Sequence, residues 1–141
     1  MTVQQHIIKL ATSAKAACPT IANSPVSQRN EALAKIAEAL EMSRAALLEA
    51  NELDLESAAE AGLDAALVDR LELNDARIDG MLDALSIVRS LPDPIGGIED
   101  LKSMVSGIQV GKMRVPLGLI GIIYESRPNV TIDAASLCLK S

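Results

Sequence analysis

Aromatic residues are nearly absent from this sequence. Its 141 residues contain no tryptophan, no phenylalanine and a single tyrosine, Tyr124. A core must therefore be built from aliphatic side chains, and the hydrophobic fraction of 49% supplies enough of them. No run of about 18 apolar residues occurs, so no membrane-spanning helix is expected. The first residues lack the charged, apolar and small-residue regions of a secretory signal.

Positive charge, cysteine and histidine are also scarce. The net charge is −6 and the isoelectric point is near 4.7, so nucleic acid is not an expected partner. The two cysteines, Cys18 and Cys138, stand far apart in alanine- and leucine-rich surroundings. This favours reduced, buried thiols in a cytoplasmic protein over a disulfide framework. His6 has no cysteine or carboxylate at metal-binding spacing, so no metal site is predicted.

The spacing of apolar residues predicts helices over the first half of the chain. Residues 3–17 form a short amphipathic helix, for which Thr2 is available as the N-terminal cap. A long helix follows over residues 26–50, with Pro25 at the first helical position, where its missing N–H costs nothing. The apolar stripe of this helix consists of Leu33, Ile36, Ala37, Leu40, Leu47 and Leu48.

Two further helices are expected before the chain changes character. Gly62 is a suitable helix stop, and one or two helical turns follow within Leu63–Arg70. Asn74 begins another helix, which ends in the proline- and glycine-rich loop Leu91–Gly97. The apolar stripe of this last helix is Ile78, Met81, Leu82, Leu85 and Val88.

The periodicity changes after this loop. Apolar and polar residues alternate through Ile108–Val115, which fits a half-exposed antiparallel strand or hairpin with bends at Gly107 and Gly111. Leu119–Ile123 follows a Pro-Leu-Gly corner and is apolar, which indicates a buried parallel strand. Thr131–Ser141 has helical spacing without a terminator, so we interpret the sequence as a fragment of a longer protein.

Polar side chains follow the predicted buried strand directly, in Tyr124–Arg127. Because ligands of open α/β sheets bind beyond the carboxyl ends of the strands, we expect the active site here. The guanidinium of Arg127 could bind a carboxylate or phosphate through two nitrogens, or form a salt bridge with Glu125 or Asp133.

The segment Arg114–Ser141 closely resembles the glutamate-5-semialdehyde dehydrogenases, also called γ-glutamyl phosphate reductases, of the aldehyde dehydrogenase superfamily. Its most specific run is YESRPNVT, Tyr124–Thr131, where the wider superfamily carries a Pro-Trp-Asn turn. The resemblance extends to Arg29–Glu41, Ala58–Met81 and Leu91–Ile98.

The resemblance implies a reaction and a fold. Such enzymes use NADPH to reduce L-glutamyl 5-phosphate to L-glutamate 5-semialdehyde in proline biosynthesis, with release of phosphate. The implied fold is α/β, with a helical segment over residues 1–98 leading into the start of a Rossmann-like cofactor domain over 99–141. The catalytic cysteine lies downstream of the matching segment, so the chain alone is expected to be inactive. The full-length protein is expected to be a cytoplasmic homo-oligomer.

The resemblance also suggests roles for the polar cluster. Arg127 is the candidate for substrate binding, and Tyr124, Glu125 and Ser126 are the candidates for cofactor binding. Asn129 is either a side-chain donor to the oxyanion that develops on the way to the thioester or in the thiohemiacetal, or a helix N-cap. The alternative function is a non-catalytic helical interaction module, which gives no reason for a buried strand that ends in charged groups.

Overall fold

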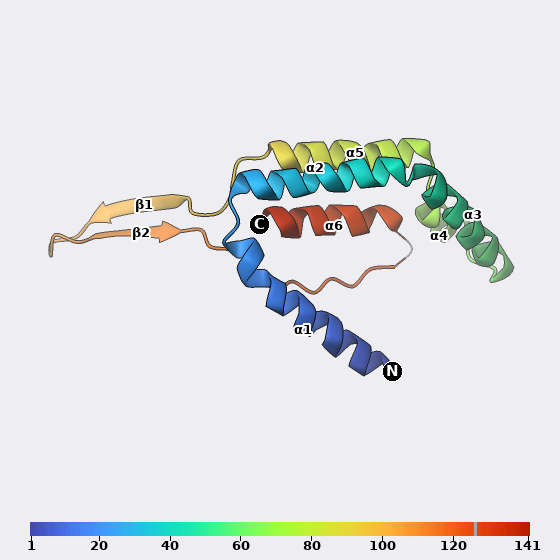
Figure 1. Cartoon of the computed structure of the whole chain (residues 1–141), viewed down its shortest axis with the longest axis horizontal. Helices are drawn as coiled ribbons and strands as arrows, with labels where there is room; N and C mark the ends of the chain where they lie inside the picture. The colour runs from blue at the N-terminus through green and yellow to red at the C-terminus, as the bar shows by residue number, and fades with distance from the viewer. Residues whose placement is uncertain (126) are drawn as a thin grey trace.

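The computed structural model describes residues 1–125 and 127–141. Within these ranges the chain is rich in helix, and its sheet consists of a single two-stranded hairpin (Figure 1). The elements are α1 (Val3–Ala22), α2 (Val26–Met42), α3 (Arg44–Glu60), α4 (Ala65–Leu71), α5 (Asp75–Ser90), β1 (Ile98–Ser103), β2 (Gln109–Met113) and α6 (Pro128–Lys140).

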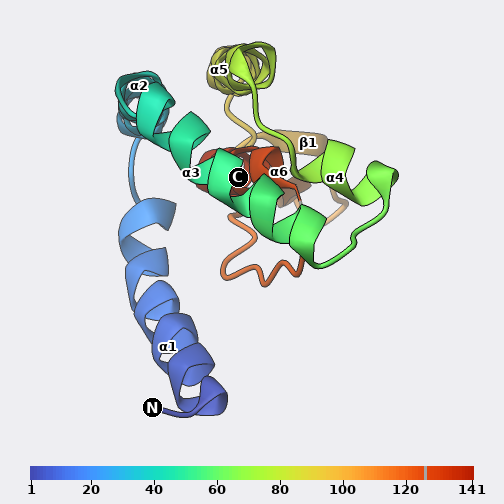
Figure 2. The same ribbon diagram turned by 90° about the vertical axis from the view of Figure 1, so that its right-hand side faces the viewer.

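The core lies between α2, α5 and α6. Figures 1 and 2 show α2 and α5 next to each other, with α6 packed beneath them. Leu33 of α2 and Ile78 of α5 are fully buried, and Ile132 and Leu139 of α6 pack against the same cluster. Burial of one such aliphatic side chain contributes about 1.5–3 kcal/mol, so this cluster holds the three helices together. Its buried members are Leu33, Leu40, Leu73, Ile78, Met81, Leu85 and Val88.

Helix caps lie where the sequence predicts at Thr2, Gly62 and Asn74, but α1 continues through Pro19 to Ala22, beyond its predicted end at residue 17. Thr2 caps α1 in a reciprocal pair, with Gln5 N donating to Thr2 Oγ1 over 3.2 Å and Thr2 N donating to Gln5 Oε1 over 2.9 Å. The Asn74 side chain accepts from Arg77 N at the start of α5. Gly62 follows α3 with a φ of +69°, a left-handed conformation that glycine adopts without strain.

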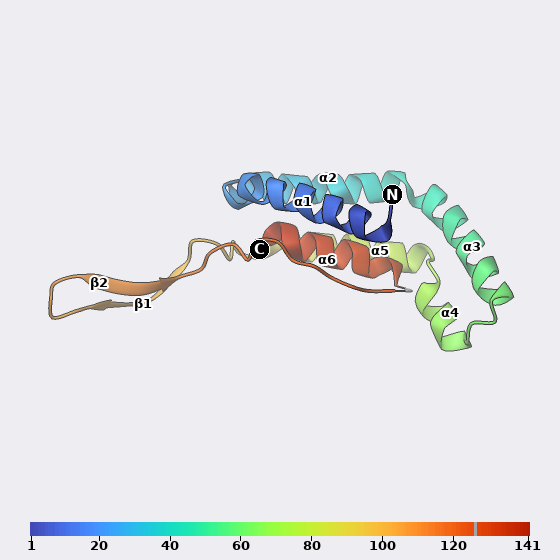
Figure 3. The same ribbon diagram turned by 90° about the horizontal axis from the view of Figure 1, so that it is seen from below.

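The predicted long helix over 26–50 is wrong, because the chain bends at Ser43. The helix α2 ends at Met42 and α3 begins at Arg44, and Figure 3 shows α3 turning away from α2. The Arg44 guanidinium holds the junction against α5, with Nη1 at 3.1 Å from Asp75 Oδ1 and Nη2 at 2.6 Å from Asp79 Oδ1. Hydrogen bonds to Glu41 and Asp79 raise the pKa of Arg44.

The hairpin β1–β2 projects away from the helices (Figures 1 and 3). The strands pair antiparallel, with Ile98 opposite Met113, and Gly107 turns the chain with a φ of +86°. The predicted hairpin is confirmed, but every residue of both strands is exposed, so neither face is covered. Gly111 lies inside β2 and is not a bend. A Cβ there would come within 3.1 Å of Glu99 O.

The predicted buried strand Leu119–Ile123 is wrong for this structure. The segment has no regular secondary structure, and it crosses from the hairpin to the start of α6 with Ile120 41% and Ile123 102% exposed (Figure 1). A parallel strand needs a neighbouring strand to pair with. In the described part of the chain the only strands are those of the hairpin, and they pair with each other. The expected α/β fold is therefore confirmed only as a helical layer with a small antiparallel sheet.

Candidate functional site

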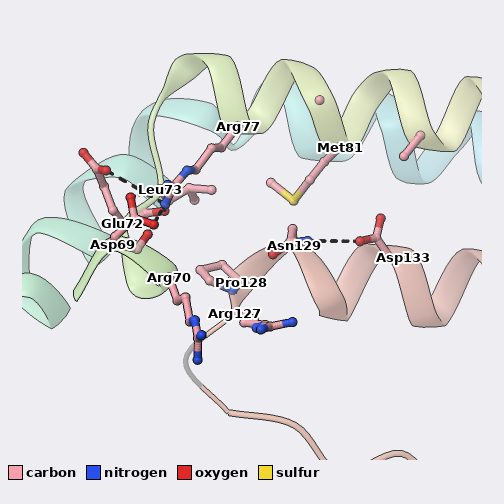
Figure 4. Close-up of a pocket in the computed structure, with 12 residues that line it drawn as sticks. Asp69, Arg70, Glu72, Leu73, Arg77, Met81, Arg127, Pro128, Asn129 and Asp133 are labelled. Carbon is pink, nitrogen blue, oxygen red and sulfur yellow. Dashed lines mark hydrogen bonds and ion pairs between the residues drawn. The ribbon is translucent and has the colours of Figure 1, made fainter. Parts of the chain in front are cut away.

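A cavity of about 480 Å³ lies where the N-terminal end of α6 faces α4 and α5 (Figure 4). This size suits a small-molecule ligand. Both arginine and acidic side chains line the cavity, and they come from segments far apart in the sequence. The lining residues are Asp69, Arg70, Glu72, Leu73, Arg77, Gly80, Met81, Ala84, Arg127, Pro128, Asn129 and Asp133.

The start of α6 brings two predicted site residues, Arg127 and Asn129, to the cavity. Pro128 occupies the first helical position, where no N–H is needed. Arg127 is the residue just before the helix, and its side chain makes no capping hydrogen bond. Asn129 lies inside the helix, so its alternative role as an N-cap is wrong. Its Nδ2 donates to Asp133 Oδ2 over 3.1 Å, which leaves the second amide hydrogen for another acceptor.

The alternative of an Arg127 salt bridge is not realised. Among the ion pairs of the described residues, none joins Arg127 to Glu125 or Asp133. Arg127 is exposed and is one of the residues that line the cavity, and Figure 4 shows its side chain near Pro128 at the start of α6. The side chain is thus placed to meet a ligand that enters the cavity.

The residues that precede Arg127 lie differently. Tyr124 is half-exposed, and its hydroxyl is 2.7 Å from Thr131 Oγ1. Neither Tyr124 nor the exposed Glu125 lines the cavity. Ser126 lies outside the described residues. The structure therefore brings Arg127 and Asn129 to the cavity, whereas Tyr124 and Glu125 do not line it.

Sequence reasoning missed the other wall of the cavity, which α4 and the turn after it provide. Arg77 of α5 secures this turn, with Nη2 at 2.9 Å from Asp69 Oδ1 and Nη1 donating to Glu72 O over 2.6 Å. Arg70, in the last turn of α4, extends toward the start of α6 (Figure 4). The short helix and the Asn74 cap could be predicted, but local sequence does not indicate that this turn meets α6.

A buried asparagine of α3 supports the same turn. Asn51 is 4% exposed, its Nδ2 donates to Leu71 O over 2.9 Å, and its Oδ1 accepts from Leu73 N over 2.6 Å. One amide side chain thus satisfies two backbone groups that α4 and α5 leave unpaired. Because these groups flank Glu72, Asn51 fixes the backbone next to Arg70.

A second cavity, of about 650 Å³, lies between α1, α2, α6 and the segment after the hairpin. It is lined mainly by apolar side chains and by both cysteines, which are free thiols. Cys138 is exposed and Cys18 partly exposed, so the prediction of buried thiols is wrong. In α1, the Cys18 Sγ donates to Ala14 O over 3.3 Å.

Arg29 lines this apolar cavity and forms an ion pair in which the guanidinium is buried and the carboxylate is partly exposed. Its side chain is 3% exposed, its Nη2 lies 2.8 Å from Asp93 Oδ2, and its Nη1 donates to Lys140 O over 2.9 Å. The Ile95 N–H and the Arg29 guanidinium lower the pKa of Asp93, against the opposing effect of burial. Arg29 thereby ties the end of α6 to the loop after α5.

Neither a metal centre nor a membrane span emerges from the described residues. No group of three or more histidine, cysteine or acidic side chains is placed to hold a metal ion in this part of the chain. None of the helices described combines the length and the apolar character that crossing a bilayer requires.

The chain matches no protein-family model. It does match solved structures, and two of these have a TM-score of 0.90. A γ-glutamyl phosphate reductase from Thermotoga maritima is 44% identical, over 94% of this chain and 32% of that chain. A γ-glutamyl phosphate reductase from Saccharomyces cerevisiae is 32% identical, over 100% of this chain and 35% of that chain. The chain thus spans about a third of the length of each, and the resemblance seen in the sequence is confirmed.

Proposed function

We propose that this chain is the N-terminal part of an NADPH-dependent glutamate-5-semialdehyde dehydrogenase. Such an enzyme reduces L-glutamyl 5-phosphate to L-glutamate 5-semialdehyde and releases phosphate, in proline biosynthesis. The observation that carries the proposal is the match in both sequence and fold to γ-glutamyl phosphate reductases. The cavity at the start of α6 supports it, because its size and its arginines suit a small anionic substrate.

In this proposal the start of α6 binds and orients the substrate. Arg127 pairs with its phosphate or carboxylate, and the N-terminal end of the helix adds a favourable dipole for negative charge. The unused amide hydrogen of Asn129 donates to the carbonyl oxygen, which gains negative charge as the carbonyl carbon is attacked. NADPH supplies the hydride when bound. The nucleophilic cysteine comes from the remainder of the protein, since Cys18 and Cys138 line the other cavity.

We further propose that residues 99–141 begin a Rossmann-like cofactor domain, with Tyr124, Glu125 and Ser126 near the cofactor. The exposed apolar side chains of Leu119–Ile123 support this assignment, because they have the composition of an inner strand and lack a covering layer here. Further residues of the longer protein would supply the neighbouring strands. A homo-oligomer in the cytoplasm remains our expectation for that protein.

The proposal is tested with the full-length protein in the reverse direction. We expect NADPH to form from L-glutamate 5-semialdehyde and NADP⁺ only when inorganic phosphate is present, and the 141-residue chain alone to be inactive. Dependence on phosphate distinguishes this reaction from simple aldehyde oxidation. Absence of turnover by correctly folded full-length protein would contradict the proposal.

The role of Arg127 has its own test in the full-length enzyme. Arg127→Ala should raise the KM for the substrate by about ten-fold or more, since a charge-assisted hydrogen bond contributes about 1.5–3 kcal/mol. Arg114→Ala is the matched control, because Arg114 pairs with Glu99 at the exposed hairpin. Unchanged kinetics for Arg127→Ala would remove it from the binding site.

A further inference from the structure

We propose that Arg70 is a second anion-binding residue of the α4–α6 cavity, and that Arg70 and Arg127 together hold the phosphate group of the ligand. Both side chains line the cavity, one from the last turn of α4 and the other from the residue before α6. Figure 4 shows both guanidinium groups beside Pro128, at the same end of the cavity. The identity of the ligand rests on the proposed function, whereas the assignment of both arginines to one site rests on their positions in the cavity.

The charges around the cavity leave these two arginines available. The third arginine, Arg77, is paired with Asp69 at 2.9 Å and lies 3.9 Å from a carboxylate oxygen of Glu72. No ion pair of the described residues includes Arg70 or Arg127.

One carboxylate of the cavity remains, that of Asp133, which accepts from Asn129. The cavity lining as a whole is neutral, with three arginines and three carboxylates, but no carboxylate of the described residues pairs with Arg70 or Arg127. A bound anion would supply the partner that these two guanidinium groups lack.

The backbone next to each arginine is held in place before a ligand binds, on the α4 wall of the cavity and at the start of α6. Asn51 bonds the peptide groups of Leu71 and Leu73, directly after Arg70. Pro128 fixes the backbone after Arg127 as the first residue of α6. Anchored backbones leave only side-chain freedom to be lost on binding, which favours affinity for a small ligand.

A phosphate monoester or acyl phosphate suits this pair better than a carboxylate does. A terminal phosphate has three oxygens, enough to accept paired hydrogen bonds from two guanidinium forks, whereas a carboxylate has two. The cavity of about 480 Å³ has room for the remainder of a molecule the size of glutamyl phosphate. We therefore assign the Arg70–Arg127 pair to the phosphate end of the substrate.

The direct test is titration of the 141-residue chain with inorganic phosphate, followed by backbone amide shifts in NMR. Ionic strength is held constant with chloride, and L-glutamate is titrated separately. We expect saturable shifts at the end of α4 and the start of α6 with phosphate and weaker shifts with L-glutamate. The proposal is overturned if phosphate produces no saturable shift there, or if L-glutamate binds more tightly.

Variants assign the effect to Arg70. Arg70→Gln and Arg127→Gln should each weaken phosphate binding about ten-fold or more, and Arg70→Lys should weaken it less, because the charge stays while the fork is lost. The control Arg114→Gln changes an exposed arginine of similar charge on the hairpin and should bind phosphate like the wild type. Arg70 is exposed, so its replacement should leave the fold intact, which the amide spectrum reports directly. Wild-type affinity in Arg70→Gln would overturn the assignment.

Kinetics of the full-length protein separate this inference from the proposed function. With an active enzyme, Arg70→Gln should raise the KM for phosphate in the reverse direction and leave the KM for NADP⁺ unchanged. A raised KM for NADP⁺ alone would place the pair at the cofactor and contradict our assignment. If the full-length protein is inactive but the chain binds phosphate through Arg70, the proposed function fails and the phosphate site stands.

Discussion

Replacement of Asn51 by alanine tests how the fold builds the wall of the candidate site. Asn51 is 4% exposed and serves Leu73 N over 2.6 Å and Leu71 O over 2.9 Å. The alanine variant leaves a buried N–H without an acceptor, which costs about 1–3 kcal/mol. The Leu71 carbonyl is less enclosed and adds less than about 1 kcal/mol, because water can replace the amide. The expected loss in free energy of unfolding is therefore about 1–4 kcal/mol.

Urea unfolding followed by circular dichroism measures this loss. The control is Asn23→Ala, because Asn23 is exposed and its side chain makes a single bond, to Pro19 O at 2.7 Å. Its replacement should cost less than about 1 kcal/mol. A second variant, Asn51→Asp, retains an acceptor for Leu73 N but in its ionised form cannot donate to Leu71 O. Burial should raise the pKa of this carboxyl, so the variant should be least stable at neutral pH relative to the wild type and recover as the pH falls.

The result that would refute the reasoning is a small effect at the buried position. If Asn51→Ala and Asn23→Ala lose the same stability, the turn between α4 and α5 does not depend on the buried amide. The backbone next to Arg70 would then be held by Arg77 and its partners alone.

Three further predictions concern stability. Arg29→Met should destabilise the chain by about 1–3 kcal/mol in urea unfolding, because it leaves the Lys140 carbonyl and the partly exposed Asp93 carboxylate without their partner; an unchanged stability would contradict this. The lowered pKa of Asp93 means that its ionised form stabilises the folded state at neutral pH. The difference in free energy of unfolding between wild type and Asp93→Asn should therefore shrink as the pH falls below about 4. A constant difference between pH 7 and pH 3 would be evidence against this. Ile78→Ala should lower the free energy of unfolding by about 2–5 kcal/mol in the same assay, since Ile78 is 0% exposed. Ile87 is 62% exposed, so Ile87→Ala should lower it far less. Equal losses would show that the core lies elsewhere.

Much of the helical layer could be predicted because its signals are local. The cap at Asn74 and the stripe that includes Ile78 and Leu85 lie within a few turns of one another, and both the helix and its buried face are confirmed. Thr2 and Gly62 act through hydrogen bonds and backbone angles within a few residues. Such features need no knowledge of what the helix packs against.

The errors arise where a distant partner decides the outcome. Ser43 lies in an unbroken helical pattern, and at the bend Arg44 pairs with Asp75 and Asp79 of another helix. The apolar run Leu119–Ile123 has the composition of an inner strand, but a strand forms only beside another strand. Composition alone could not indicate whether that neighbour is present.

The candidate site shows the same division. Arg127 and Asn129 could be placed at a helix start because Pro128 marks one, and the structure brings both to a cavity. The opposite wall, with Arg70 and the turn held by Asn51, belongs to a segment far away in the sequence. Only the packing of α5 on α6 brings the two walls together.

The most direct test of the account is a crystal structure of the full-length protein with inorganic phosphate or a non-hydrolysable analogue of L-glutamyl 5-phosphate. We predict that the phosphate lies within hydrogen-bond distance of Arg127, at the cavity between α4, α5 and α6, and that Leu119–Ile123 is paired between neighbouring strands. A ligand bound elsewhere, with Arg127 facing solvent and Leu119–Ile123 still uncovered, would contradict it.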